Sequence, residues 1–112
     1  MAHYLAELYS PKPAWLALDQ DGRRRFFEAV GSGMATLSAL CVEAIALGET
    51  DAAILHAPSQ KFFAIWRAPD ATAMAALVSG IAASRWHDYF DTINATGPGV
   101  DLGGHLTQLA AL

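Results

Sequence analysis

The sequence contains little charge and almost no cysteine. Only 16% of its 112 residues are charged, whereas 54% are hydrophobic, which excludes a disordered or solvating chain. The single cysteine, Cys41, excludes an internal disulfide and favours a reducing compartment, and we expect it to be a small buried side chain. No uncharged run reaches the ~20 residues of a membrane span, and the N-terminus lacks the pattern of a signal peptide. These absences predict a cytoplasmic protein with no membrane partner.

Positive charge is also scarce. Seven Lys and Arg residues stand against eleven Asp and Glu residues, and the only basic cluster is Arg23–Arg25. We therefore expect no nucleic acid partner, since such proteins usually carry a broad basic face. The four histidines have no metal-ligand spacing, and the glycines form no phosphate-binding motif, so we expect no metal and no cofactor.

Hydrophobic spacing nevertheless divides the whole chain into regular elements. It predicts strands at 3–9, 42–49, 61–67 and within 88–94, and helices at about 20–40 and 71–84. Asp19 and Asp70 precede the two helices as candidate N-caps. Gly31 and Gly33 interrupt the first helix, which indicates a bend or a close approach to the sheet. We expect residues 97–99 to form a turn that interrupts regular secondary structure, and residues 104–112 to form a short helix docked on the domain.

The order β-α-β-β-α-β predicts one α+β domain over 1–112 with a ferredoxin-like fold. Right-handed crossovers place both helices on one face of a four-stranded antiparallel sheet. Strand alternation offers two sets of side chains, and the large hydrophobic residues Ile45, Leu47, Phe63 and Ile65 suit the helix-covered face. The open face would then carry one mixed, largely apolar set: His3, Leu5, Glu7, Tyr9, Ala44, Ala46, Gly48, Phe62, Ala64 and Trp66.

A face this aromatic is costly in water, so we expect a second copy of the chain to cover it. Small residues opposite Phe62 and Trp66 predict a pocket for a hydrophobic or aromatic small molecule between the two sheets. The expected assembly is a homodimer that forms a dimeric α+β barrel.

Glu7 is the first candidate for chemistry, because apolar surroundings raise the pKa of a carboxyl toward the range useful for proton transfer. Alternatively, Arg67 or another basic group fixes its carboxylate, or Glu7 lies at the rim of the barrel. Asn94, with Thr92 on the same strand face, is the second candidate, since the first and fourth strands are expected to be neighbours. Alternatively, Asn94 only satisfies backbone hydrogen bonds at the strand end before Gly97. The candidate ligand-binding residues are His3, Tyr9, Phe62, Trp66 and Thr92, although Tyr9 and Trp66 could simply pack.

Three segments, 7–15, 63–67 and 86–94, resemble the dimeric α+β barrel superfamily. It includes antibiotic-biosynthesis-type monooxygenases, muconolactone isomerases and haem-degrading enzymes, and the chain looks like an uncharacterised branch of small bacterial proteins within it. The resemblance implies the ferredoxin-like fold and the dimer. Haem-degrading relatives use an Asn on the first strand, a Trp on the third and a His on the second helix. Trp66 matches, but position 7 is Glu and 71–84 contains no histidine, which weighs against haem.

The leading hypothesis is a cofactor-independent enzyme of isomerase, proton-transfer or monooxygenase type that acts on an apolar or aromatic metabolite. The alternative is a non-catalytic dimeric protein that binds a similar ligand or serves as an accessory subunit. A haem-binding or haem-degrading protein is the minor alternative.

Overall fold

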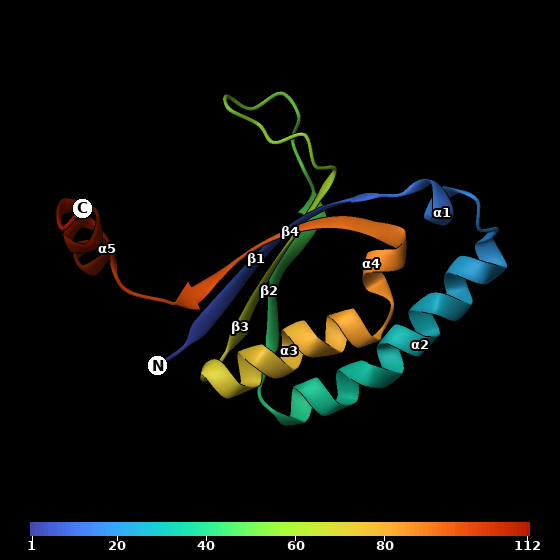
Figure 1. The fold of residues 1–112 in the computed structure, drawn as a ribbon, viewed down its shortest axis with the longest axis horizontal. Coiled ribbons are helices and arrows are strands. Elements are labelled where there is room, and N and C mark those ends of the chain that lie inside the picture. Colours follow the sequence, from blue (N-terminus) through green and yellow to red (C-terminus); the bar gives the residue numbers. More distant parts are fainter.

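The computed structural model describes all residues, 1–112, and confirms the predicted α+β fold (Figure 1). Its elements follow the predicted order, with two additional short helices and a helix at the C-terminus. They are β1 (His3–Pro11), α1 (Pro13–Leu16), α2 (Gln20–Ala39), β2 (Glu43–Glu49), β3 (Phe62–Ala68), α3 (Ala71–Ala83), α4 (Trp86–Tyr89), β4 (Phe90–Pro98) and α5 (Leu102–Ala110).

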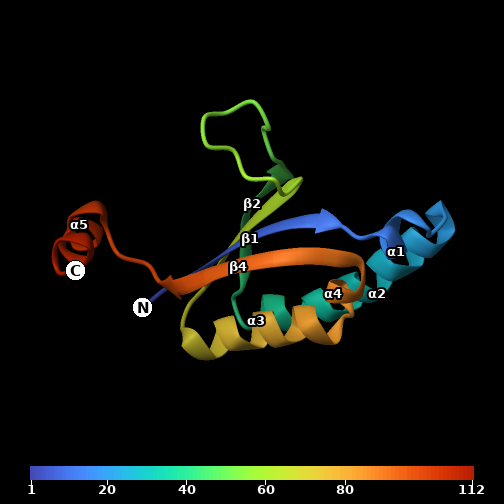
Figure 2. The ribbon, with the colours of Figure 1, turned by 45° about the horizontal axis from the view of Figure 1, so that its top comes forward.

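The sheet is antiparallel and has the strand order β2-β3-β1-β4. Helices α2 and α3 lie together on one face, and no helix covers the other face (Figures 1 and 2). The first and fourth strands are neighbours, as predicted, and their register places Glu7 opposite Asn94. No helix combines the length and the apolarity needed to cross a bilayer.

Both predicted N-caps are present. The Asp19 carboxylate accepts a hydrogen bond of 2.7 Å from the Gly22 amide, and the Asp70 carboxylate accepts one of 2.8 Å from the Ala73 amide. Each carboxylate satisfies an amide that has no partner inside its helix, which fixes where α2 and α3 begin. The helices thus start where the sequence pattern places them.

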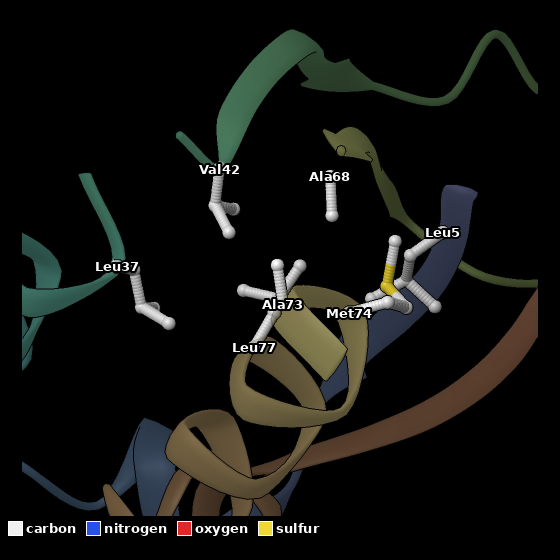
Figure 3. Close-up of a cluster of buried hydrophobic side chains, with 7 residues drawn as sticks. All are labelled: Leu5, Leu37, Val42, Ala68, Ala73, Met74 and Leu77. Carbon is white, nitrogen blue, oxygen red and sulfur yellow. The ribbon is translucent and has the colours of Figure 1, made fainter. Parts of the chain in front are cut away.

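The buried core lies between α3, the end of α2 and the sheet (Figure 3). Leu5 on β1 and Leu77 on α3 are completely buried, and they form one cluster with Leu37, Val42, Ala68, Ala73 and Met74. Leu5 therefore points toward the helices, contrary to the predicted assignment of faces.

The two faces of the sheet are the reverse of the prediction. Leu5 and Glu7 are buried under the helices, and Trp66 packs against the same core. Both sets contain large hydrophobic side chains, so strand alternation by itself does not determine which set the helices cover. The residues left on the open face come from the opposite set: Tyr4, Ala6, Leu8, Phe63, Ile65 and Ile93.

A β-bulge in β2 also breaks the predicted alternation there. The register with β3 shifts between Ala44 and Ala46, so that Ala44 pairs with Trp66 while Leu47 pairs with Ala64. The extra residue moves Leu47 to the same side as Ala44. The other side of β2 carries Ala46 and Gly48.

The C-terminal region differs from the prediction in two ways. Strand β4 continues through Gly97 to Pro98, which an edge strand tolerates because its outer side needs no ladder hydrogen bond. Helix α5 is present, but it lies apart from the rest of the chain in both views, with its leucines exposed (Figures 1 and 2). Within a single chain, it does not dock.

Cys41 is exposed, not buried as predicted. It follows the last residues of α2 with a φ of 61°, in the left-handed region where a glycine usually ends a helix. A side chain in this conformation costs about 1–2 kcal/mol.

Replacing Cys41 by glycine should raise the free energy of unfolding by about 1 kcal/mol, because it removes this steric cost. Cys41→Val is the matched variant and should lower that free energy by a similar amount, since a β-branched residue tolerates positive φ poorly. Urea denaturation followed by tryptophan fluorescence measures both. Equal stability of the two variants would contradict the assigned conformation.

Candidate functional site

A cavity of about 570 Å³ lies between the helices and the sheet. Nineteen residues line it and fourteen of these are hydrophobic. Its walls come from β1, β2, β3, α2 and α3, with Trp86 of α4 at one side. A volume of this size suits a small organic ligand, for which about 300–1,000 Å³ is usual. The pocket therefore lies within one chain, whereas the sequence-based prediction placed it between the sheets of two chains.

Small side chains on the helices create this space. On α2, Ala29, Gly33 and Thr36 line the cavity, and their spacing of four and three residues places them on one helical side. The same spacing recurs on α3 with Ala76, Gly80 and Ala83.

Gly33 explains one of the two interruptions noted in the sequence. A Cβ atom added at Gly33 would meet no atom within 4 Å, so close packing on the sheet is not the reason for this glycine. The predicted close approach of the helix to the sheet at Gly33 is therefore wrong, because the space beside this glycine is open.

Glu7 is the one charged residue in the cavity wall and is only 3% exposed. Its Oε1 accepts a hydrogen bond of 2.7 Å from the Trp66 indole Nε1, across the β1–β3 pair. Its Oε2 accepts no hydrogen bond, yet it is not among the fully buried side-chain oxygens that lack a partner. One carboxyl oxygen is thus fixed by the protein, while the other remains accessible to a ligand.

Burial raises the pKa of Glu7 above its ordinary value, because the apolar wall disfavours the carboxylate. The indole hydrogen bond and the charge of His87 act in the opposite direction and leave the pKa raised. Burial also raises the pKa of Tyr9, and the nearby Glu7 adds to this effect. Tyr9 therefore keeps its proton and can donate a hydrogen bond into the cavity.

Aromatic rings close the cavity beside Tyr9. Trp86 meets the Tyr9 ring edge-on with centroids 5.2 Å apart, and it stacks on Phe90 at 4.2 Å. Phe62 stacks on the other side of Tyr9 at 5.9 Å. Edge-on and offset contacts of this kind hold rings in fixed orientations. The Tyr9 ring is therefore held in place between β3 and α4.

Of the predicted site residues, only Glu7, Tyr9 and Trp66 line the cavity. Phe62 supports it through Tyr9. Asn94 is directly opposite Glu7 in the β1–β4 register but is exposed and lies outside the wall.

Two other predicted residues are also outside the cavity wall. The Thr92 hydroxyl makes a 3.4 Å hydrogen bond to the carbonyl of Phe90, and His3 pairs with Ala68 near the start of β1. The structure does not bring these two residues to Glu7.

Sequence reasoning missed Trp86 and the helical wall. Trp86 precedes the predicted fourth strand, within 88–94; in the structure it begins the short helix α4, and its indole Nε1 is buried without a partner. The repeated spacing of small residues on the two helices was the available signal for the wall.

The predicted alternative for Glu7, an ion pair with Arg67, does not form. Arg67 is exposed and pairs with Tyr4 and Glu43 across the sheet, which places it on the open face. The carboxyl of Glu7 therefore has an indole and not a guanidinium as its partner.

The cavity is poorly suited to haem. No histidine, lysine or arginine lines it, so it offers neither the imidazole that the haem-degrading relatives use nor a cation for the haem propionates. Helix α3 contains no histidine, as expected from the sequence. No group of three or more His, Cys, Asp or Glu side chains is arranged to hold a metal ion.

Comparison with known proteins supports the fold and leaves the activity open. Residues 2–112 match the model of DUF6616, described as a family of unknown function. No curated protein matches the chain in sequence.

Among solved structures, similarity is found to a candidate chlorite dismutase, with a TM-score of 0.68 and 18% identity over 90% of this chain and 45% of that one. A variant of chlorite dismutase from Candidatus Nitrospira defluvii is similar with a TM-score of 0.63 and 16% identity, over 86% of this chain and 40% of that one. A protein of unknown function from Rhodopseudomonas palustris is similar with a TM-score of 0.59 and 14% identity, over 89% of this chain and 83% of that one. The chain thus spans less than half the length of the chlorite dismutases, and at these identities the likeness shows the fold alone.

The glycines of α2 allow a matched test of the cavity. Gly33→Met and Gly31→Met should each raise the free energy of unfolding by about 0.5–1 kcal/mol, because both sites are helical and have open space for a side chain. Only Gly33 lines the cavity, so only Gly33→Met should abolish the quenching of tryptophan fluorescence by the neutral probe 2-naphthol. Equal binding by the two variants would show that the probe does not enter this space.

The raised pKa of Glu7 predicts a pH dependence of stability. The folded state holds this proton more tightly than the unfolded chain, whose value is near 4.5, so the free energy of unfolding falls as pH rises from about 4.5 through the folded-state pKa. Glu7→Gln should remove this decrease and become the more stable form at pH 8, with little difference at pH 4. Urea denaturation between pH 4 and pH 8 measures the free energy of unfolding of both proteins. If this free energy changed with pH in the same way in the two proteins, the burial of an ionisable Glu7 would be contradicted.

Proposed function

Because the chain belongs to the family of unknown function DUF6616, we propose its activity from the site: proton transfer on a neutral aromatic or apolar metabolite. The reaction is of isomerase type and needs no cofactor. It takes place in the cavity between the helices and the sheet, with Glu7 as the acid and base.

One observation carries this proposal. Glu7 is buried in an apolar wall, one of its carboxyl oxygens is held by Trp66, and the other has no partner in the protein. A raised pKa brings a carboxyl closer to the range in which it both accepts and returns a proton near neutral pH.

The chemistry follows from these groups. The Glu7 carboxylate removes a proton from a carbon beside a carbonyl. The electron pair of that C–H bond forms a carbon–carbon double bond to the carbonyl carbon, and the π pair of the carbonyl moves onto its oxygen. Tyr9, which makes no hydrogen bond within the chain, donates its hydroxyl to the resulting oxyanion. The neutral Glu7 then returns the proton to the same or to a neighbouring carbon.

The wall also indicates the kind of ligand. It contains no positive side chain, so a carboxylate or phosphate would lose its hydration without gaining a partner. Trp66, Trp86 and Tyr9 offer flat apolar surfaces. A neutral ring of modest size with one carbonyl or hydroxyl group fits this composition best.

Oxygenation of such a ring is the related reaction suggested by the resemblance to antibiotic-biosynthesis-type monooxygenases. It would use the same first step, because removal of a proton by Glu7 produces the electron-rich anion that reacts with oxygen. Proton transfer is therefore the activity to test first.

Ligand binding without turnover is the second candidate function. It is favoured by the wall itself, since fourteen of its nineteen residues are hydrophobic and can hold a ligand without chemistry. In this case Glu7 would serve only as a hydrogen-bond partner. Binding would then be saturable, and no carbon-bound hydrogen of the ligand would exchange with solvent.

The two functions can be separated with 2-tetralone, a neutral bicyclic ketone with acidic hydrogens beside its carbonyl. In D₂O, the protein should accelerate incorporation of deuterium at these positions, measured by mass spectrometry or proton NMR. Glu7→Gln should slow the catalysed exchange by about 10²–10⁴-fold, which is the usual contribution of a positioned acid or base.

Glu43→Gln is the matched control, because Glu43 is an exposed carboxylate on the opposite face of the sheet and should leave exchange unchanged. Binding of 2-tetralone with no exchange above background would assign a carrier. Exchange that is equally fast in Glu7→Gln would remove Glu7 from the mechanism.

A further inference from the structure

The cavity has one closed end and one open end. At the closed end, Glu7, Ala64 and Leu77 line the wall and are 3%, 2% and 0% exposed. At the open end, Leu40 and Leu47 line the same wall but are 42% and 61% exposed. The cavity therefore leads from the buried carboxyl of Glu7 to a mouth, which is edged by these two leucines.

The register of the sheet gives the direction of this path. Ala64 of β3 pairs with Glu7 of β1 on one side and with Leu47 of β2 on the other, so the three residues form one row across the sheet. Neighbouring strands lie about 4.8 Å apart, which places the backbone of Leu47 about 10 Å from that of Glu7. Because β2 is an edge strand, the row ends at solvent. Leu40, the C-cap of α2, lines the helical side of the mouth.

Small side chains leave the middle of the path open. Ala64 is the residue of the row that separates Glu7 from Leu47, and Ala76 and Gly80 contribute the wall from α3. The volume of about 570 Å³ equals the share of about nineteen water molecules in the liquid, so a ring with one carbonyl fills only part of it. A ligand that fills the cavity must extend from the ring toward the mouth.

The wall indicates the chemistry of this extension. Glu7 is its one charged residue, so nothing along the path compensates a charge on the ligand. Apart from the aromatic residues, its other polar side chains are Thr36 and Ser84, and the Ser84 hydroxyl already donates a 2.6 Å hydrogen bond to the Ile81 carbonyl. The space between Glu7 and the mouth therefore suits an unbranched apolar chain.

We propose that the ligand is a cyclic ketone that carries an alkyl chain: the carbonyl lies at Glu7, and the chain runs along the row over Ala64 and leaves between Leu40 and Leu47. This inference deepens the proposed function and rests on it for the position of the ring. The reverse orientation would place the chain against the free oxygen of the Glu7 carboxyl and would leave the carbonyl between two leucines.

Binding of 4-methyl-, 4-propyl- and 4-pentylcyclohexanone tests the path, because the chain of these ketones lies opposite the carbonyl. Quenching of tryptophan fluorescence gives the dissociation constants, since Trp66 and Trp86 line the cavity. Each added methylene should tighten binding about threefold to fourfold, as the burial of one CH₂ group does.

Leu47→Asp should weaken binding of the pentyl ketone at least about tenfold and change that of the methyl ketone less than about twofold, because the new charge meets only the chain. Ile45→Asp is the matched control: Ile45 is on the same strand and 51% exposed, but it does not line the cavity. This variant should bind all three ketones like the wild-type chain. Near-UV circular dichroism shows whether each variant retains its packed core, which neither position enters.

Binding that does not depend on chain length would overturn the alkyl path, and so would a pentyl ketone that Leu47→Asp and Ile45→Asp bind equally well. Exchange of deuterium beside the carbonyl of the methyl ketone, measured in D₂O, tests the proposed function separately. Exchange with chain-independent binding would retain proton transfer and overturn the chain. Chain-dependent binding without exchange would do the opposite, and failure of all three ketones to bind would overturn both.

Discussion

The hydrogen bond from the Trp66 indole to Glu7 is the interaction on which the site depends. It joins β3 to β1 at 2.7 Å beneath the helices, where a carboxyl with no partner would be strongly disfavoured. An indole has a single donor and carries no charge, so it orients the carboxyl without neutralising it. Glu7 therefore remains ready to gain or lose a proton, which a salt bridge to arginine would prevent.

The cavity results from a compromise in packing. Leu5 and Ala68 are completely buried in the packed part of the layer between helices and sheet, whereas near Glu7 the helices present glycine and alanine and leave about 570 Å³ open. Unfilled space beside a core lowers stability, because its lining atoms lose their contacts. Retaining this space next to a buried acid is readily explained by a ligand that occupies it.

The sequence predicted the order of elements, the two N-caps and the pairing of the first strand with the fourth, because these follow from local spacing and from the strand order. It also predicted that Glu7, Tyr9 and Trp66 share one face. It could not decide which face the helices cover, since a period of two defines two sets of side chains but not their environment. The bulge beside Ile45 further disturbed the alternation in β2.

Several misjudged positions share a physical cause. Cys41 and the segment Gly97–Gly99 were interpreted from residue type, but their conformations depend on the helix end at Leu40 and on pairing with β1. The helix α5 was correctly anticipated, but not its separation from the sheet, because the contacts of Gly99 with Ala2 and Tyr4 join distant parts of the sequence. Such contacts appear only when the fold is assembled.

The central claim is that Glu7 is an ionisable group in an apolar cavity of a single chain. The chain has only four glutamates, and the other three, Glu28, Glu43 and Glu49, are exposed. A pH titration of ¹³C-labelled glutamate carboxyls by NMR therefore tests the claim directly. One resonance, assigned by its loss in Glu7→Gln, should titrate at clearly higher pH than the other three. Four carboxyls that titrate together in the ordinary range would contradict the account.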